Sequence, residues 1–244
     1  MSYIHKTSLI ILIILVQTRL KVSAVDDPLY QLCSSSAGSF SPNSVYVKTL
    51  NTLLGSLQTG IVTPSGFSRA AIHKKLFGIA LCRGDVNSTE CNTCVVDASA
   101  EIRKRCPYNK GAIIWYDNCF LKYLDHNFFG QIDIQNKFEL VNVANISNNP
   151  TLFNQKVKGL LSNLADQGSR SRVLYAAGET KLDTFTNLYG LAQCTQDLSS
   201  KDCKICLDEA ISELPSCCDG RQGGRVVGGS CNVRYEVYPF LNSS

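Results

Sequence analysis

The chain has 244 residues, with 24 basic and 20 acidic residues and a formal net charge of +4 at pH 7. Three of the basic residues precede residue 25, so the rest of the chain is almost neutral. That balance argues against nucleic-acid binding and against adsorption to a charged membrane surface. The length allows one domain or two.

The N-terminus predicts a secretory signal peptide over residues 1–24. His5 and Lys6 precede an unbroken apolar run over residues 9–16, and Ala24 ends a segment typical of a cleavage site. The run is too short for a transmembrane helix, which needs about 20 apolar residues. No later run approaches that length, so we expect a secreted, extracellular protein without a membrane span.

Two helices are predicted in each half of the remaining chain. Apolar residues recur at helical spacing over residues 47–57 and 153–164, and Gly60 is expected to end the first of these helices. A second helix in each half carries a Cys-x2-Cys pair. Ser88 and Ser199 are the expected N-caps of these cysteine-bearing helices.

Strands are predicted after the second helix of each half. Residues 111–116 and 120–123 flank one turn, and residues 224–227 and 232–238 flank another that contains Gly228 and Gly229. Helices packed on an antiparallel sheet form an α+β unit of about 100 residues.

The two halves are copies of one cysteine-rich domain. Five cysteines recur 112 positions later in the same order, so that Cys82, Cys91, Cys94, Cys106 and Cys119 correspond to Cys194, Cys203, Cys206, Cys218 and Cys231. Upstream of them the copies correspond at a shift of 107, which indicates a five-residue insertion in the second copy. We therefore predict domains over residues 25–135 and 136–244.

The twelve cysteines of a secreted chain predict disulfides. A zinc site is the alternative interpretation of the Cys-x2-Cys pairs. The two pairs lie more than 100 residues apart, one in each copy, which is not the spacing of a zinc ribbon. We expect no metal and no cofactor.

The Cys-x8-Cys-x2-Cys pattern with two further cysteines resembles the plant ginkbilobin-homologous, or stress-antifungal, domain. Two tandem copies behind a signal peptide are similar to the cysteine-rich repeat secretory proteins of plants. The resemblance implies two tandem ginkbilobin-like domains, each an antiparallel sheet packed with two α-helices and stapled by disulfides. It also implies an apoplastic location and a role in defence or stress.

The resemblance implies most of the disulfide pairing. It joins Cys33 to Cys106, Cys82 to Cys91, Cys94 to Cys119, Cys194 to Cys203, and Cys206 to Cys231. The second copy has no counterpart of Cys33 and has an additional Cys217 beside Cys218. These two cysteines remain unassigned between a vicinal disulfide, an intermolecular bridge and free buried thiols.

No catalytic motif is present. His73 and His126 belong to no nucleophile or metal-binding motif, so we expect no enzyme activity. The adhesion-like tripeptide Arg83-Gly84-Asp85 has no counterpart in the second copy and is interpreted as a turn.

A mannose-binding site is what the resemblance implies for the second domain. Two of its residues fall on Arg225 and Glu236, and the asparagine falls near Asn142 or Asn145. A guanidinium and a carboxylate can bind adjacent sugar hydroxyls. The alternative interpretation is a structural cross-strand ion pair between Arg225 and Glu236. The first copy has different residues at the three positions, namely Ser34, Ile113 and Leu124.

Two functions follow from these observations. The protein is predicted to bind a mannose-rich glycan, or to bind an extracellular protein without any affinity for sugar. N-glycosylation sequons begin at Asn87, Asn145 and Asn242, and Asn87 is the preferred site because Asn242 lies close to the C-terminus. The oligomeric state does not follow from the sequence.

Overall fold

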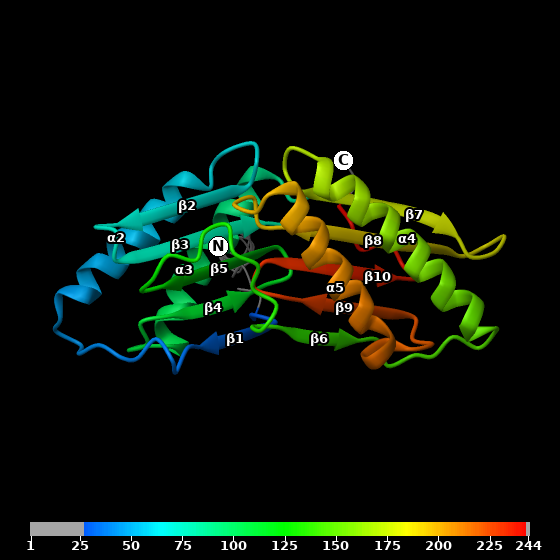
Figure 1. Cartoon of the computed structure of the whole chain (residues 1–244), viewed down its shortest axis with the longest axis horizontal. Coiled ribbons are helices and arrows are strands. Elements are labelled where there is room, and N and C mark those ends of the chain that lie inside the picture. Colours follow the sequence, from blue (N-terminus) through cyan, green and yellow to red (C-terminus); the bar gives the residue numbers. More distant parts are fainter. Residues whose placement is uncertain (1–26, 243–244) are drawn as a thin grey trace, which may run out of the picture.

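The computed structural model describes residues 27–242 and contains two five-stranded antiparallel sheets, each with two helices on one face (Figure 1). The predicted signal peptide lies outside the described residues. The first unit comprises β1 (Tyr30–Cys33), α2 (Val45–Gly60), β2 (Phe67–Ile72), β3 (Leu76–Cys82), α3 (Ser88–Arg105), β4 (Ala112–Trp115) and β5 (Cys119–Leu124). The second comprises β6 (Phe138–Val141), α4 (Pro150–Arg170), β7 (Tyr175–Lys181), β8 (Asn187–Cys194), α5 (Ser200–Cys218), β9 (Gly223–Val227) and β10 (Cys231–Glu236).

Both sheets have the same topology. The strand order is β1-β4-β5-β3-β2 in the first and β6-β9-β10-β8-β7 in the second, with every neighbouring pair antiparallel. The tandem α+β architecture predicted from the sequence is confirmed. The predicted strands correspond to β4, β5, β9 and β10, and the other six strands were not predicted.

The helix ends agree with the sequence in two cases and differ in one. Helix α2 ends at Gly60, and Ser199 caps α5 by accepting a hydrogen bond from the backbone N–H of Asp202. The N-cap of α3 is Asn87 instead of Ser88. Asn87 Oδ1 accepts hydrogen bonds from two backbone N–H groups of the first turn, because asparagine at this position reaches both donors.

Each domain has its own core between the sheet and its two helices, and close contact between helix and strand depends on one glycine in each. A Cβ atom on Gly78 of β3 would lie 2.9 Å from the Leu53 side chain of α2. Its repeat counterpart Gly190 in β8 stands in the same relation to Leu160 and Leu164 of α4. That Gly78 and Gly190 have the same role supports the interpretation of the two halves as repeats. The missing side chain also explains how the first helix of each copy packs closely against the middle of its sheet.

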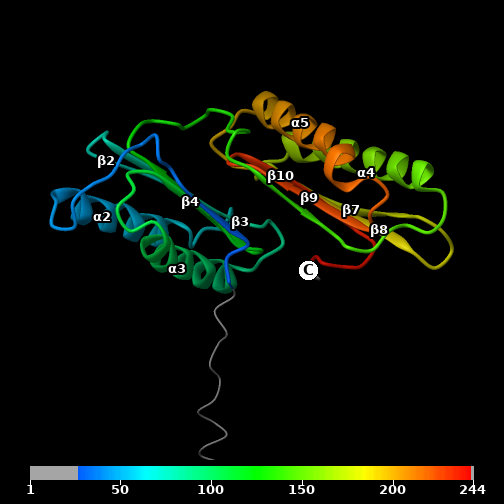
Figure 2. The same cartoon turned by 90° about the horizontal axis from the view of Figure 1, so that it is seen from below.

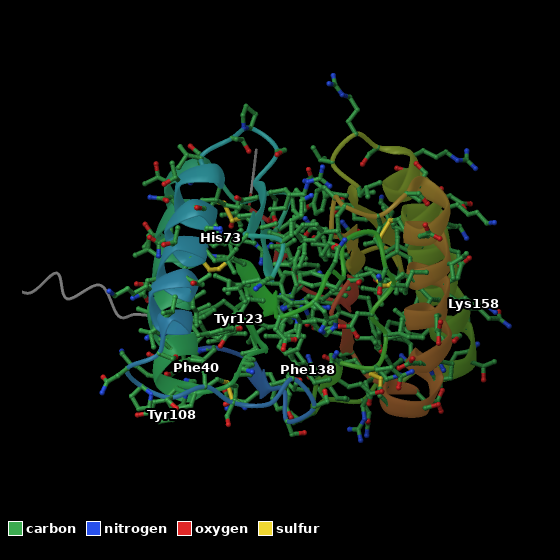
Figure 3. The ribbon with its side chains drawn as sticks, turned by 60° about the vertical axis from the view of Figure 1, so that its left-hand side comes forward. Phe40, His73, Tyr108, Tyr123, Phe138 and Lys158 are labelled. Atoms are coloured by element: carbon green, nitrogen blue, oxygen red, sulfur yellow. A yellow bond between two sulfur atoms is a disulfide. The ribbon has the colours of Figure 1, made fainter. Side chains whose placement is uncertain are left out.

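The two domains adjoin at the ends of their strands, with their helices on opposite sides of the molecule (Figures 1 and 2). A third apolar core lies at this junction. Trp115 and Phe120 of the first sheet lie in it with Phe138 and Val227 of the second domain, and the connecting segment adds Phe128. Phe138 is labelled between the two domains in Figure 3. The interface is therefore packed like an interior.

All twelve cysteines form disulfides. The structure joins Cys33 to Cys106, Cys82 to Cys91, Cys94 to Cys119, Cys194 to Cys203, Cys206 to Cys231 and Cys217 to Cys218. Of the three alternatives for the last pair, the structure has the vicinal disulfide. Its consequence is that β6 has no covalent link to α5, whereas Cys33–Cys106 links β1 to the C-terminus of α3.

Candidate functional site

A groove of about 340 Å³ lies where the two domains meet. Its lining brings together Asn142, Arg225 and Glu236, the three residues predicted for the sugar site. Asn145, the alternative asparagine, is not among the lining residues and forms an isolated β-bridge with Arg221. The remaining lining residues are Leu29 and Asp117 of the first domain and Leu140, Val141, Arg234 and Tyr238 of the second.

Strand register determines which of these side chains are neighbours. Arg225 of β9 pairs with Arg234 of β10, and Glu236 pairs with Gly223. The predicted ion pair between Arg225 and Glu236 is therefore wrong. The reason is the turn, in which the Gly228 N–H donates to the Cys231 carbonyl and shifts the hairpin by two residues from the assumed pairing.

Arg225 is buried, with 6 % of its surface exposed. Its Nη1 donates to Asp117 Oδ1 at 2.7 Å, across the domain boundary, and its Nε donates to Asn232 Oδ1 at 3.4 Å. Burial lowers the pKa of Arg225 to about 10, against the opposing effect of Asp117. The guanidinium therefore stays protonated at neutral pH.

Asp117 binds three arginines. It lies between β4 and β5, and it accepts hydrogen bonds from Arg83 at 2.9 Å, Arg225 at 2.7 Å and Arg234 at 3.2 Å. Burial alone would raise the pKa of Asp117, but Arg225, Arg234 and Arg83 outweigh it and hold the pKa below its usual value. Half of the Asp117 side chain is nevertheless exposed, so its carboxylate also faces solvent.

Glu236 has one satisfied and one unsatisfied oxygen. Oε1 accepts a hydrogen bond from Arg234 Nε at 3.2 Å, whereas Oε2 is buried and has no hydrogen-bond partner within residues 27–242. The absence of a side chain on Gly223 makes room for this carboxylate, because a Cβ there would lie 1.8 Å from Oε2. A buried carboxylate oxygen without a donor is costly unless a ligand supplies one.

Asn142 follows β6 and is held by its backbone. Its N–H donates to the Gly223 carbonyl at 3.0 Å, and its Oδ1 accepts a hydrogen bond from the Ala144 N–H at 2.9 Å. Within the described chain, the Nδ2 group of Asn142 donates to no other residue. The groove thus offers an amide donor from Asn142 and carboxylate acceptors from Glu236 and Asp117.

The first domain has a different surface at the equivalent positions. Ile113 is buried in the core between the domains, and Leu124 packs against the same core. Lys122, the counterpart of Arg234, lies over the Phe128 ring at 4.6 Å, as Arg234 lies over the Phe240 ring at 4.1 Å. The cation–aromatic pair is common to both copies, but the polar groove is not.

The tripeptide Arg83-Gly84-Asp85 lies beside the second domain, with Arg83 buried and Gly84 exposed. Arg83 makes two hydrogen bonds to Asp85, at 2.6 and 2.9 Å, and only 5 % of its side chain is exposed. A Cβ atom on Gly84 would collide with the Tyr175 ring of the second domain. The tripeptide therefore lies at the contact between the domains, and its buried, paired arginine is not available for adhesion.

Asp117 is one of the charged groove residues that the sequence did not predict, and Arg234 is the other. Asp117 corresponds to Gly229 in the second copy, at the same shift of 112 that relates the cysteines. A charged residue in one copy opposite glycine in the other is a weak signal. Its partners Arg225 and Arg234 lie more than 100 positions away in the sequence, so only the domain arrangement reveals the contact.

N-glycosylation is expected at Asn87, whose side chain is exposed at the start of α3. The capping bonds use only Oδ1, which leaves Nδ2 for the glycan. Asn242 is expected to be unmodified, because its backbone N–H donates to Asp85 at 2.7 Å near the chain end. Peptide mapping of protein secreted from plant cells checks this order, and an unmodified Asn87 would contradict it.

Among residues 27–242, no helix has the length and apolar character required to cross a bilayer. The six disulfides need an oxidising compartment to form. The disulfides agree with the secreted, extracellular location that the sequence predicts.

Comparison with known proteins gives a consistent result. The family model described as salt stress response/antifungal matches residues 32–126 and 141–238. The chain is 56 % identical over 220 residues to an antimicrobial ginkbilobin-2-like protein of Castanea crenata, covering 89 % of this chain and 90 % of the relative. It is 45 % identical over 237 residues to cysteine-rich repeat secretory protein 38 of Arabidopsis thaliana, covering 95 % and 93 %.

The fold has a solved counterpart. The tandem DUF26 ectodomain of the Arabidopsis thaliana cysteine-rich receptor-like protein PDLP8 superposes with a TM-score of 0.76 at 27 % identity, covering 87 % of this chain and 98 % of that one. The repeated cysteines, the paired five-stranded sheets and the two family matches agree with one another. The chain belongs to the salt stress response/antifungal family, as a protein with two tandem domains of that type.

Proposed function

We propose that this protein is a secreted extracellular plant protein of defence or stress responses, and that it binds mannose-type glycans in the groove where its two domains meet. The observation that carries the proposal is that Glu236, Arg225 and Asn142 line one groove, in which Glu236 Oε2 has no hydrogen-bond partner among residues 27–242. A sugar hydroxyl is a donor of suitable size. Its hydrogen bond to a carboxylate is charge-assisted and therefore strong.

The groove chemistry suits a neutral sugar. Glu236 and Asp117 offer acceptors, Asn142 offers a donor, and the half-exposed ring of Tyr238 offers an apolar face at the edge. Adjacent hydroxyls of a pyranose can both donate and accept, and the ring has apolar C–H faces. The words antifungal in the family description and antimicrobial in the name of one relative support a microbial glycan as the ligand.

Binding without catalysis is the better interpretation of the carboxylates. A glycosidase needs one carboxylic acid that stays protonated near neutral pH. Asp117 is paired with three arginines that hold its pKa below the usual value, and Glu236 is paired with Arg234. Asp117 is therefore not placed to act as a general acid.

A second candidate function is a carbohydrate-independent protein-interaction module. The observation that favours it is an apolar groove of about 500 Å³ between α4 and α5. Val157, Ile211 and Leu214 line it together with polar residues at its rim. This groove lies away from the domain junction and is separate from the glycan groove.

Retention on mannan–agarose tests the proposal. The wild type is expected to be retained, and Glu236→Gln is expected to weaken binding by about 1.5–3 kcal/mol, or tenfold or more, because one charge-assisted acceptor is lost. Glutamine has nearly the same volume, so the melting temperature should change little. Glu139→Gln is the matched control, since Glu139 is exposed on β6 and does not line the groove.

The outcomes separate the candidates. Equal retention of wild type and Glu236→Gln would remove Glu236 from the site. A wild type that passes through mannan–agarose unretained would end the glycan proposal and leave the protein-interaction module as the remaining candidate.

A further inference from the structure

The glycan groove is built by both domains. Asp117 and Leu29 come from the first domain and line the groove beside the second-domain residues. Asp117 reaches across the junction because the turn between β4 and β5 points at the second sheet, where its carboxylate meets Arg225 and Arg234. The Gly228 carbonyl of the opposite turn accepts a hydrogen bond from Trp115 Nε1 in return.

The charges in the groove are balanced. Arg225 and Arg234 supply two positive charges, and Asp117 and Glu236 supply two negative charges. Arg83 lies beside them and is compensated by the buried carboxylate of Asp85. Removing the charge of Asp117 would leave Arg225 and Arg234 with a single carboxylate between them. The groove would then attract anions.

Two features of Asp117 bear on ligand choice. Its Oδ1 already accepts hydrogen bonds from both groove arginines, so a ligand carboxylate would compete with it for the same donors. Half of its side chain is exposed, so it faces an incoming ligand directly and would repel an anion at short range. A sugar hydroxyl neither competes for the arginine donors nor is repelled by Asp117, because it is uncharged and can donate to a carboxylate that is already paired.

We infer that Asp117 determines specificity in this groove, by selecting neutral polyhydroxylated sugars and rejecting acidic polysaccharides such as those rich in uronic acid. The inference rests on the proposed glycan binding. Asp117 acts mainly as a repulsive element against the wrong ligand and secondarily as an acceptor for the right one. The groove has no net charge only because the first domain contributes Asp117. The residues predicted for sugar binding, in contrast, all lie in the second domain.

The test is the ratio of affinities for mannan and for polygalacturonate, measured at one fixed salt concentration on the full-length mature protein. The wild type is expected to favour mannan. Asp117→Asn keeps the size of the side chain and removes its charge, so the ratio should fall by at least about tenfold. Asp117→Glu keeps the charge, so its ratio should stay close to that of the wild type.

Asp133→Asn is the matched control. Asp133 accepts a hydrogen bond from the buried Lys122 at 2.5 Å and lies near Gly229 at the same junction, but it does not line the groove. The Asp133→Asn substitution tests whether weakening any contact at the junction between the domains is enough to change the ratio of affinities. Asp117→Ser replaces Asp117→Asn in the measurement if the asparagine variant does not fold.

A ratio that falls for Asp117→Asn and not for Asp133→Asn supports the inference. A ratio that is unchanged, or that changes equally in both variants, overturns it while leaving glycan binding intact. A wild type that binds neither polysaccharide refutes the proposed function, and this inference falls with it.

Discussion

Removal of the Cys33–Cys106 disulfide is expected to lower the free energy of unfolding by about 4 kcal/mol. The bond closes a loop with a sequence separation of 73 residues, so its loss increases the entropy of the unfolded chain considerably. It also joins the edge strand β1 to the end of α3. The double variant Cys33→Ala/Cys106→Ala avoids a new free thiol, and denaturant titration measures the effect.

The matched control is the Cys82–Cys91 disulfide, whose sequence separation is only 9 residues. The same loop-entropy estimate gives about 2.5 kcal/mol for Cys82→Ala/Cys91→Ala. The first variant should therefore be the less stable of the two. An unfolding midpoint equal to that of the wild type would contradict a bond between Cys33 and Cys106.

Trp115→Ala is expected to lower the free energy of unfolding by about 3–5 kcal/mol, because it leaves a large cavity in the core between the domains. Trp115 is 2 % exposed and lies 5.3 Å from the Phe138 ring of the second domain, centroid to centroid. Its Nε1–H donates a hydrogen bond to the Gly228 carbonyl at 3.2 Å, and the substitution removes this bond as well.

Phe185→Ala is the control for this substitution. Phe185 is 96 % exposed in the loop between β7 and β8, so its removal should change stability by less than about 0.5 kcal/mol. Calorimetry compares the two variants. If Trp115→Ala had the same melting temperature as the wild type, the domains would not be packed together at Trp115.

The repeat made much of the fold predictable. A shift of 112 positions paired five cysteines and placed the same helix and hairpin in each copy. Strand β3 escaped prediction because all seven of its residues are buried, so it lacks the alternation that marks a half-exposed strand. Strand β7 escaped for another reason, since its sequence combines small and charged residues with little β preference.

The site was only partly predictable. The positions of Arg225, Glu236 and Asn142 followed from a resemblance, and the structure brings all three to one groove. The side chains that pair with these residues could not be predicted from the sequence. Asp117 and Arg234 depend on the hairpin register and on the placement of one domain against the other, and both arise from contacts between residues far apart in the sequence. A sequence pattern carries no signal for such contacts.

A crystal structure of the mature protein with a mannose oligosaccharide tests the account most directly. We predict sugar density in the groove between Asn142 and Glu236, with a hydroxyl donating to the Glu236 carboxylate and another facing Asp117. An empty groove at a concentration at which the protein binds mannan, or sugar bound only elsewhere on the molecule, would contradict it.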